Sequence, residues 1–291
     1  MPSQKEAVDP KPSLAVIAGG GGLPRKLIHA CDRKNIIPFV IGFEGQTDPS
    51  LVDNRYHLWT RLGAAAQIIQ TLKAHEIKEI VMIGSIRRPS FDELRPDWKT
   101  AHLLTRLGFK ALGDDGLLKA LKAELQKEGF EIRGVQDFVD DLLSVEGVYT
   151  SQSPDEGQWM DIEKGCKLVK LMGRLDVGQA CVVQQGIVLG VEAIEGTDKL
   201  IARCSGLKRQ GDKPTLIKVS KPRQDKSLDL PTVGPDTVEN AAQAGFAGIV
   251  VEAGNSLLID PDKTTELANQ HGLYLLGVSL DDEGTLLKRY T

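Results

Sequence analysis

Short runs of apolar residues alternate with amphipathic segments through the first half of the chain. The apolar runs predict strands at 14–17, 36–41, 56–59, 79–83 and 130–133. The amphipathic segments predict helices at 25–34, at 63–75 and from Asp114 onward. Strands that alternate with helices in this way are typical of a parallel sheet covered by helices. The first half is therefore predicted to be a Rossmann-like α/β domain.

The second half repeats this alternation after an opening hairpin. Residues 182–191 are largely apolar on both sides of Gly186, which predicts a β-hairpin. A strand leading into an ordered loop is predicted at 218–234, and further apolar strands end at Glu252 and Asp260. Helices are predicted at 161–174, 236–244 and 264–270. The second half is therefore predicted to be a second α/β domain.

The length of the chain fits two domains joined by a short linker. At 291 residues it is long enough for two domains with a core each. Residues 149–158 are polar, rich in serine, proline and glycine, and without periodicity, which is typical of a linker. We therefore expect an N-terminal domain at 1–148, a linker at 149–158 and a C-terminal domain at 159–291.

Charge and cysteine content exclude several classes of protein. A net charge of −4 gives no broad basic field, so no nucleic-acid partner is expected. The four cysteines are too irregularly spaced for a zinc site or a disulfide framework, and buried reduced thiols are expected. Residues 1–13 do not follow the pattern of a signal peptide, and no apolar run reaches the roughly 20 residues of a membrane span. We expect a cytoplasmic protein, with peripheral contact with a membrane left open.

A run of four glycines, Gly19–Gly22, follows the first predicted strand. Glycines at such a turn let backbone N–H groups approach a diphosphate at a helix N-terminus. The dinucleotide fingerprint is not matched, because Arg25 or Lys26 stands where its third glycine belongs. A diphosphate-containing nucleotide other than NAD fits better, and a tight turn without a ligand is the alternative. The basic turn at 87–88, after Gly84, either reaches a phosphate or is simply solvated.

Carboxylates gather at the ends of apolar strands in the second half. Glu192, Glu195 and Asp198 follow the hairpin, and Glu252 and Asp260 end the two later strands. Mg²⁺ is bound by a few carboxylates together with waters and phosphate oxygens, so no histidine or cysteine cluster is required. Asp260 is also explained as the N-cap of a helix that begins with proline.

The segment from Lys218 to Gly234 combines three lysines, an arginine, a glutamine and two aspartates with two prolines. The prolines exclude a regular helix. A solvated surface loop is one explanation. The other is a phosphate and metal site, and the strands that end in carboxylates favour it. The five histidines are scattered, so the candidate base or metal ligand is a carboxylate. Asp225 is the first choice, because neighbouring ammonium groups keep it ionised.

Three motifs carry a resemblance to a known family: Ile-Ala-Gly-Gly-Gly-Gly-Leu-Pro at 17–24, Glu-Ala-Ile-Glu-Gly-Thr-Asp at 192–198 and Lys-Pro-Arg-Gln-Asp at 221–225. The chain resembles the magnesium-dependent UDP-2,3-diacylglucosamine pyrophosphatases of lipid A biosynthesis, the type unrelated to calcineurin-like phosphoesterases. The likeness covers nearly the whole chain. It departs at Ser227, where members commonly carry arginine, so Ser227 and Lys226 are left out of the catalytic set.

The resemblance implies hydrolysis of the pyrophosphate bond of UDP-2,3-diacylglucosamine, giving UMP and 2,3-diacylglucosamine 1-phosphate (lipid X), in a cleft between the two domains. It implies Mg²⁺ as cofactor, with Mn²⁺ as an alternative, and a catalytic C-terminal domain. A lipid substrate adds peripheral contact with the cytoplasmic face of the inner membrane. A homodimer is expected only from base rates for soluble enzymes.

Site residues follow from combining this reaction with the motifs. The expected catalytic residues are Asp225, Lys221 and Gln224. The expected substrate-binding residues are Gly19, Gly20, Gly21, Gly84, Thr197 and Lys218. The expected metal ligands are Asp225, Asp198 and Asp229. Lysines at 218 and 221 would bind phosphate oxygens, since transferring phosphoryl oxygens are negatively charged.

Two other functions are left open at this point. A nicotinamide-dependent oxidoreductase would use the glycine turn for its cofactor and would bind NAD(P) tightly. A non-catalytic regulator that binds a sugar nucleotide would bind its ligand without magnesium and form no product.

Overall fold

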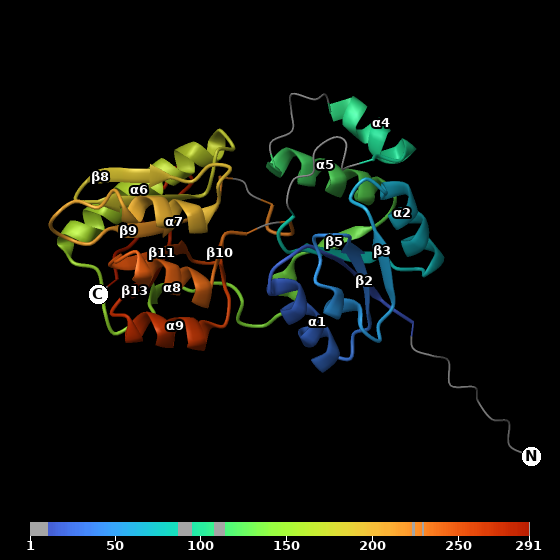
Figure 1. Ribbon diagram of the computed structural model, residues 1–291, viewed down its shortest axis with the longest axis horizontal. Coiled ribbons are helices and arrows are strands. Elements are labelled where there is room, and N and C mark those ends of the chain that lie inside the picture. Colours follow the sequence, from blue (N-terminus) through green and yellow to red (C-terminus); the bar gives the residue numbers. More distant parts are fainter. Residues whose placement is uncertain (1–10, 87–94, 108–113, 223–224, 229, 291) are drawn as a thin grey trace, which may run out of the picture. The chain divides into compact units, whose positions relative to one another are not determined.

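The computed structural model describes residues 11–86, 95–107, 114–222, 225–228 and 230–290 (Figure 1). The chain divides into two compact units, residues 1–140 and 141–291. Each unit contains its own sheet, as expected for two α/β domains. No helix in the described part of the chain is both long enough and apolar enough to cross a bilayer.

The first unit is built on a five-stranded parallel sheet with the order β3-β2-β1-β4-β5. Its strands are β1 (Leu14–Ala18), β2 (Pro38–Phe43), β3 (His57–Thr60), β4 (Glu79–Ile83) and β5 (Glu131–Arg133). Its α-helices are α1 (Leu23–Arg33), α2 (Ala65–Ala74), α4 (Trp98–Leu107) and α5 (Asp114–Lys127). The described part of this unit also contains two 3-10 helices, η1 (Pro49–Val52) and η2 (Val135–Asp137).

This strand order confirms the Rossmann-like prediction. Every residue of β1 and β2 is buried, as in a parallel sheet covered on both faces, which explains why these strands are continuous apolar runs in the sequence. The chain proceeds from β1 to one side of the sheet and then returns to place β4 on the other side of β1. The turns after β1 and β4 therefore lie at the point where the strand order reverses, where ligands bind in open α/β sheets.

The second unit is built on a six-stranded mixed sheet with the order β6-β13-β11-β9-β7-β8. Its strands are β6 (Gly147–Val148), β7 (Ala180–Gln184), β8 (Ile187–Val191), β9 (Thr215–Lys218), β11 (Gly248–Glu252) and β13 (Tyr274–Val278). Its helices are α6 (Glu156–Arg174), α7 (Thr197–Ser205), α8 (Pro235–Gln243) and α9 (Pro261–Gln270). The short strands β10 (Thr232–Val233) and β12 (Leu257–Leu258) form a separate parallel pair.

Two apolar cores lie on opposite faces of this sheet, because successive strand residues point to opposite sides. Along β7, Ala180 and Val182 belong to one core, which includes residues of α7, α8 and α9. Cys181 and Val183 belong to the other core, which includes residues of α6. All four cysteines of the chain are buried and free of disulfides, as predicted.

The segment predicted as a linker packs on the second unit. Directly before this segment, β6 pairs antiparallel with β13, and within it Tyr149 N donates to Leu275 O at 2.9 Å. Ser151 donates to Asn269 Oδ1 from its N and Oγ, at 2.8 and 2.9 Å. The division between the units falls after Asp140, earlier than the boundary at 148 that composition suggested.

Helix α6 begins earlier than the predicted 161–174, because Asp155 and Gln158 form a capping box. Asp155 Oδ1 accepts from Gln158 N at 2.8 Å, and Gln158 Oε1 accepts from Asp155 N at 2.9 Å. Farther along the helix, the buried Asp161 accepts from the backbone N–H groups of Gln185 and Gly186, at 2.8 and 2.5 Å. Helix α6 thereby fixes the turn of the predicted β7–β8 hairpin, where both turn residues have positive φ.

Candidate functional site

Two of the strands that were predicted to end in carboxylates, β8 and β11, end at one edge of the six-stranded sheet, whereas Asp260 follows β12 of the separate pair and is the N-cap of α9. Strands β9, β11 and β13 are parallel, so their C-terminal ends meet there. Strand β7 is antiparallel to β9 and β8 is antiparallel to β7, so β8 also ends at this edge. The edge thus receives Glu192 after β8, Lys218 at the end of β9 and Glu252 at the end of β11. Ligands in open α/β sheets bind outside the edge where the parallel strands end.

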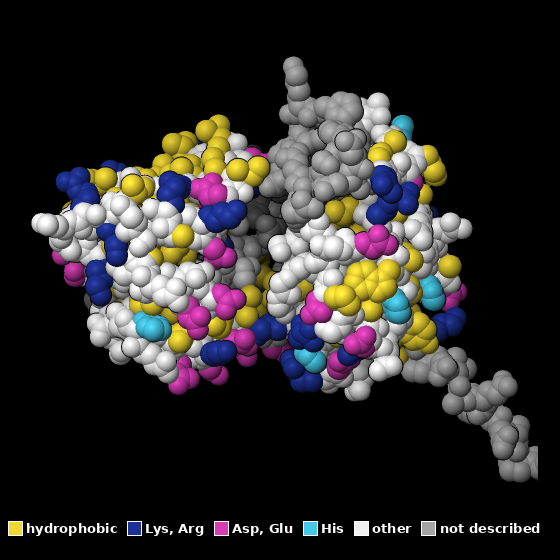
Figure 2. Space-filling model, viewed as in Figure 1, with side chains coloured by type: hydrophobic (Ala, Val, Ile, Leu, Met, Phe, Trp, Pro, Cys, Tyr) yellow, Lys and Arg dark blue, Asp and Glu magenta, His cyan; other side chains and the backbone are white. Residues whose placement is uncertain are grey.

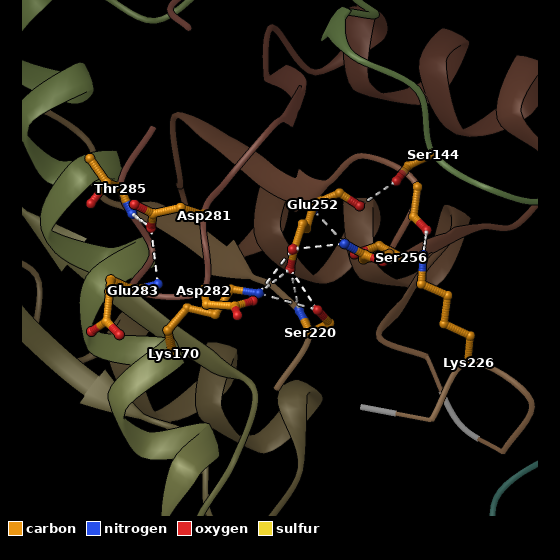
Figure 3. A network of polar contacts seen from close by, with 12 residues as sticks. Ser144, Lys170, Ser220, Lys226, Glu252, Ser256, Asp281, Asp282, Glu283 and Thr285 are labelled. Atoms are coloured by element: carbon orange, nitrogen blue, oxygen red, sulfur yellow. Dashed lines mark hydrogen bonds and ion pairs between the residues drawn. The ribbon is translucent and has the colours of Figure 1, made fainter. Parts of the chain in front are cut away.

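Glu252 is buried at this edge, and both oxygens of its carboxylate accept hydrogen bonds (Figure 3). Lys170 Nζ, on α6, donates to the two oxygens at 2.9 and 2.8 Å. Ser220 donates from its N at 3.0 Å and its Oγ at 2.7 Å, and Asn255 Nδ2 donates at 2.9 Å. These donors compensate the desolvation of the buried carboxylate, which would otherwise cost several kcal/mol. Both carboxylate oxygens of Glu252 are therefore occupied by hydrogen bonds from protein donors, which leaves Glu252 unsuited to binding a metal ion.

Two lysines that were predicted to bind phosphate lie at the end of β9 and just beyond it. Lys218 Nζ donates to Thr232 O at 2.9 Å. Lys221 Nζ donates to Asp176 Oδ1 at 2.5 Å, and the Lys221 side chain is 15% exposed. The carboxylate of Asp176 offsets the charge of Lys221, so a phosphate would have to share or replace this ion pair, and phosphate binding by the two lysines stays a prediction.

Asp225 lies on the same loop as Lys221, and its side chain is oriented by a local turn. Asp225 Oδ1 accepts from Ser227 N at 3.1 Å and from Ser227 Oγ at 2.7 Å. Such an aspartate turn fixes the carboxylate relative to the backbone of its own loop. Ser227 thus orients the carboxylate that is predicted to be catalytic.

Thr197 and Asp198 begin helix α7, directly after the acidic segment that follows β8. Thr197 Oγ1 donates to Glu192 Oε1 at 2.6 Å, and Gln179 N donates to Glu192 Oε2 at 3.0 Å. Asp198 Oδ1 accepts from Asn240 Nδ2 at 3.1 Å. The structure therefore places Thr197 and Asp198 at the sheet edge that also carries Lys218, while Glu192 serves to attach the start of α7 to the sheet.

In the first unit, three of the predicted glycines pack backbone against backbone. A Cβ atom on Gly19 would lie 2.5 Å from Ser85 O, and a Cβ atom on Gly84 would lie 2.7 Å from Gly20 O. Gly20 and Ser85 also exchange two backbone hydrogen bonds, at 2.7 and 3.0 Å. Close approach of the two turns thus explains these glycines without a ligand. Gly21 differs, because it has a φ of 89° and an added Cβ would meet no atom within 4 Å.

The N-terminus of α1 follows Gly21 directly. Its N-cap is Gly22, which provides no side-chain hydrogen bond, and its first turn contains no acidic residue. The first N–H groups of a helix and the positive end of its dipole favour an anion. This arrangement is compatible with the predicted role of Gly21 in substrate binding, which stays a prediction.

Two of the predicted site residues, Gln224 and Asp229, and the basic turn at 87–88 lie outside the described residues. Among the residues that the structure does describe, no three His, Cys, Asp or Glu side chains are grouped so as to hold a metal ion. Asp225 and Asp198 each carry the oxygen donors that Mg²⁺ prefers, but they bond to different neighbours, Ser227 and Asn240, and their binding of one metal ion stays a prediction. One or two carboxylates are sufficient when substrate phosphates and waters complete its shell.

Sequence reasoning missed Lys170 and Ser220. Lys170 follows Cys166 at a spacing of four residues, and Cys166 follows Ile162 at the same spacing, so Lys170 falls on the buried face of α6. A buried lysine requires a charged or polar partner. The sequence therefore contained a signal that Lys170 has a buried partner, and Glu252, which ends an apolar strand, was the natural candidate for it.

Family models match both halves of the chain. The model described as the LpxI N-terminal domain matches residues 13–142, and the model described as the LpxI C-terminal domain matches residues 145–276. The chain belongs to the LpxI family. A curated relative from Caulobacter vibrioides (strain ATCC 19089 / CIP 103742 / CB 15), named UDP-2,3-diacylglucosamine pyrophosphatase LpxI, is 37% identical over 275 residues. The match covers 91% of this chain and 97% of the relative. Membership of the LpxI family confirms the resemblance drawn from the motifs.

Solved structures add little to this LpxI assignment. An isoflavone reductase is 10% identical with a TM-score of 0.29, over 93% of this chain and 79% of its own. A complex of leucoanthocyanidin reductase with NADPH, from Vitis vinifera, is 13% identical with a TM-score of 0.28, over 92% of this chain and 78% of its own. Likenesses this weak carry no argument about fold or activity.

Proposed function

We propose that this LpxI-family chain is an enzyme that hydrolyses the pyrophosphate bond of UDP-2,3-diacylglucosamine in lipid A biosynthesis, releasing UMP and lipid X. The observation that carries the proposal is the match, 37% identical over 91% of this chain, with a relative named for this activity. Support comes from Lys218, which ends β9 at this sheet edge, and from the loop after β9, which carries Lys221 and Asp225 and is bonded to Gly254 through Lys226. The family favours this function over a nicotinamide-dependent oxidoreductase or a non-catalytic regulator.

In the proposed reaction, a water molecule attacks one phosphorus of the diphosphate, and the bond from that phosphorus to the bridging oxygen breaks. Asp225 is assigned as the base that orients this water and accepts its proton. Lys218 and Lys221 are assigned to the phosphate oxygens, where positive charge stabilises the charge of the transition state. Gln224, Thr197 and the glycine turn are assigned to substrate. The sharing of one site by the two domains stays a prediction.

A divalent cation completes the proposal. Mg²⁺, with Mn²⁺ as an alternative, would be held by Asp225 and Asp198, with Asp229 as a further candidate. When bound, it would withdraw charge from the phosphate oxygens. The oxygen-only character of these side chains is the support for this choice of metal.

Product analysis with the purified protein tests the function and the cofactor separately. We expect UMP and lipid X to form from UDP-2,3-diacylglucosamine in the presence of Mg²⁺. Chelation should lower the rate at least about 100-fold, and excess Mg²⁺ should restore it. Absence of UMP would refute the function, whereas UMP release unaffected by chelator would refute the cofactor alone. The same samples, mixed with NAD(P)H, should show no change in nicotinamide absorbance.

We also propose peripheral contact of this enzyme with the cytoplasmic face of the inner membrane, through α6. Between residues 160 and 175, the exposed side chains of α6 and its C-cap are Met160, Lys164, Lys167, Leu171, Arg174 and Leu175. They recur at a spacing of three or four residues and so share one face of the helix. Apolar side chains gather over this helix in Figure 2. Exposed apolar and basic side chains on one helix face suit the surface of a bilayer with anionic headgroups.

The position of α6 connects this face with the substrate. A Cβ atom on Gly173 would lie 3.0 Å from Lys221 Cα, so the C-terminal end of α6 borders the loop that carries the proposed phosphate-binding lysine. A substrate with two acyl chains resides in a lipid surface. Contact of the exposed apolar residues of α6 with that surface would bring the loop close to the headgroups.

Binding to lipid vesicles tests this contact. The Leu171→Glu/Leu175→Glu double variant is expected to bind vesicles of phosphatidylcholine and phosphatidylglycerol at least about tenfold more weakly, since two apolar side chains become charged. Leu207→Glu is the control, because Leu207 is 49% exposed and follows α7, which packs on the opposite face of the sheet from α6. Cosedimentation gives the bound fraction. Equal binding of the double variant and the unchanged protein would contradict the proposed surface.

A further inference from the structure

Glu252 connects three segments that are far apart in the sequence. Its carboxylate accepts from Lys170 on α6 and from Ser220 at the start of the loop after β9. Its backbone N donates to Ser256 Oγ at 3.1 Å, and its backbone O accepts from Ser144 Oγ at 2.8 Å. The residue is thus hydrogen-bonded through its backbone and its side chain, as Figure 3 shows.

This arrangement excludes direct contact between Glu252 and the substrate. The side chains of Glu252 and Lys170 are 4% and 5% exposed, and one Glu252 carboxylate oxygen alone accepts three hydrogen bonds, two of them from Ser220. A carboxylate enclosed in this way neither transfers a proton to a substrate nor binds a metal ion there. Any effect on the reaction would pass through the residues that Glu252 binds, and among these Ser220 adjoins Lys221 in the sequence.

Ser220 immediately precedes Lys221, and the loop is attached to the Glu252 turn again beyond Asp225. Lys226 Nζ donates to Gly254 O at 3.2 Å. Gly254 lies in the turn that follows Glu252, and Gly254 N donates to Ser144 O at 2.7 Å. The segment that carries Lys221 and Asp225 is therefore held at both ends. Ser220, at its start, bonds to Glu252 of β11, and Lys226, at its end, bonds to Gly254 in the turn after β11.

We propose that Glu252, supported by the charge of Lys170, is a positioning residue that acts through Ser220 to place Lys221 and Asp225 for the reaction. The inference rests on the proposed function of those two residues. Preorganisation is effective because a reactive group that is displaced by about 1 Å loses on the order of 100-fold in rate. A buried ion pair with three further hydrogen bonds provides a fixed reference point for such a loop.

Two serines provide a matched test. Ser220 and Ser144 are 5% and 2% exposed, and each donates one hydroxyl hydrogen bond to Glu252, at 2.7 and 2.8 Å. Ser144→Ala should lower the melting temperature of the protein by about 2–4 °C, and Ser220→Ala by somewhat more, because Ser220 Oγ bonds to a charged carboxylate and also accepts from Lys170 Nζ at 3.3 Å. Only Ser220→Ala is expected to lower kcat for UMP release, by about tenfold or more, with a much smaller change in KM. Ser220→Thr retains a hydroxyl and should restore kcat.

Amide hydrogen exchange provides a readout that does not depend on activity. Ser220→Ala should accelerate exchange in the peptide spanning 220–230, and Ser144→Ala should leave that peptide unchanged. Equal kcat values for the two alanine variants, or equal exchange in this peptide, would overturn the positioning role. If the unchanged protein releases no UMP, the proposed function fails, and the exchange comparison alone then decides whether Glu252 orders the loop.

Discussion

Replacing Asp225 with asparagine is expected to lower kcat for UMP release at least about 100-fold, while substrate binding is largely retained. Asparagine has nearly the same size as aspartate, and its Oδ1 can still accept from Ser227 N and Oγ, which bond to Asp225 at 3.1 and 2.7 Å. It can neither accept a proton from water nor provide an anionic metal ligand. Initial rates at saturating substrate and Mg²⁺, together with calorimetric binding of the substrate, measure the two effects.

A second aspartate of the same unit is the control. Asp212 is exposed and precedes β9, so it lies at the opposite end of that strand from Lys218. Asp212→Asn should change kcat by less than about twofold. Lys221→Ala should instead raise KM and lower kcat together, because a phosphate contact exists both before and during the reaction. Near-normal turnover of Asp225→Asn at saturating Mg²⁺ would show that the base has been assigned to the wrong residue.

The local pattern of the sequence was sufficient for most of the elements near this site. Continuous apolar runs gave β1, β2 and β4 because both faces of that sheet are buried. Gly186 identified the β7–β8 turn because a tight hairpin needs positive φ. The lysines and aspartate after β9 were assigned to a loop because Pro222 and Pro231 exclude a helix, and the described part of 219–231 contains none.

Contacts between distant segments could not be predicted in the same way. Lys170 and Glu252 are 82 positions apart, and only the packing of α6 on the sheet brings them together. The polar composition of 149–158 indicated exposure, but it did not show that the segment's backbone is bonded to β13 and its neighbours. The run of glycines did not reveal the close approach of two turns that requires Gly19, Gly20 and Gly84, and their role in substrate binding stays a prediction. In each case the deciding partner comes from another part of the chain.

Replacing Lys170 with methionine is expected to reduce the free energy of unfolding by about 3–5 kcal/mol. The substitution keeps an unbranched side chain of similar length on the buried face of α6, so packing changes little. It removes the cation that lies 2.8 and 2.9 Å from the two carboxylate oxygens of Glu252, and a buried charge is left without a counterion. Urea denaturation, followed by circular dichroism, measures the loss.

The same helix carries the control for this prediction. Arg174 pairs with Glu283, but their side chains are 42% and 68% exposed, so Arg174→Met should cost less than about 1 kcal/mol. Adding Glu252→Gln to Lys170→Met removes the uncompensated charge and should recover part of the lost stability, because an amide is far cheaper to bury than a carboxylate. A loss for Lys170→Met no larger than that for Arg174→Met would mean that Glu252 does not remain a buried anion. The ion pair would then not anchor the start of the Lys221 loop.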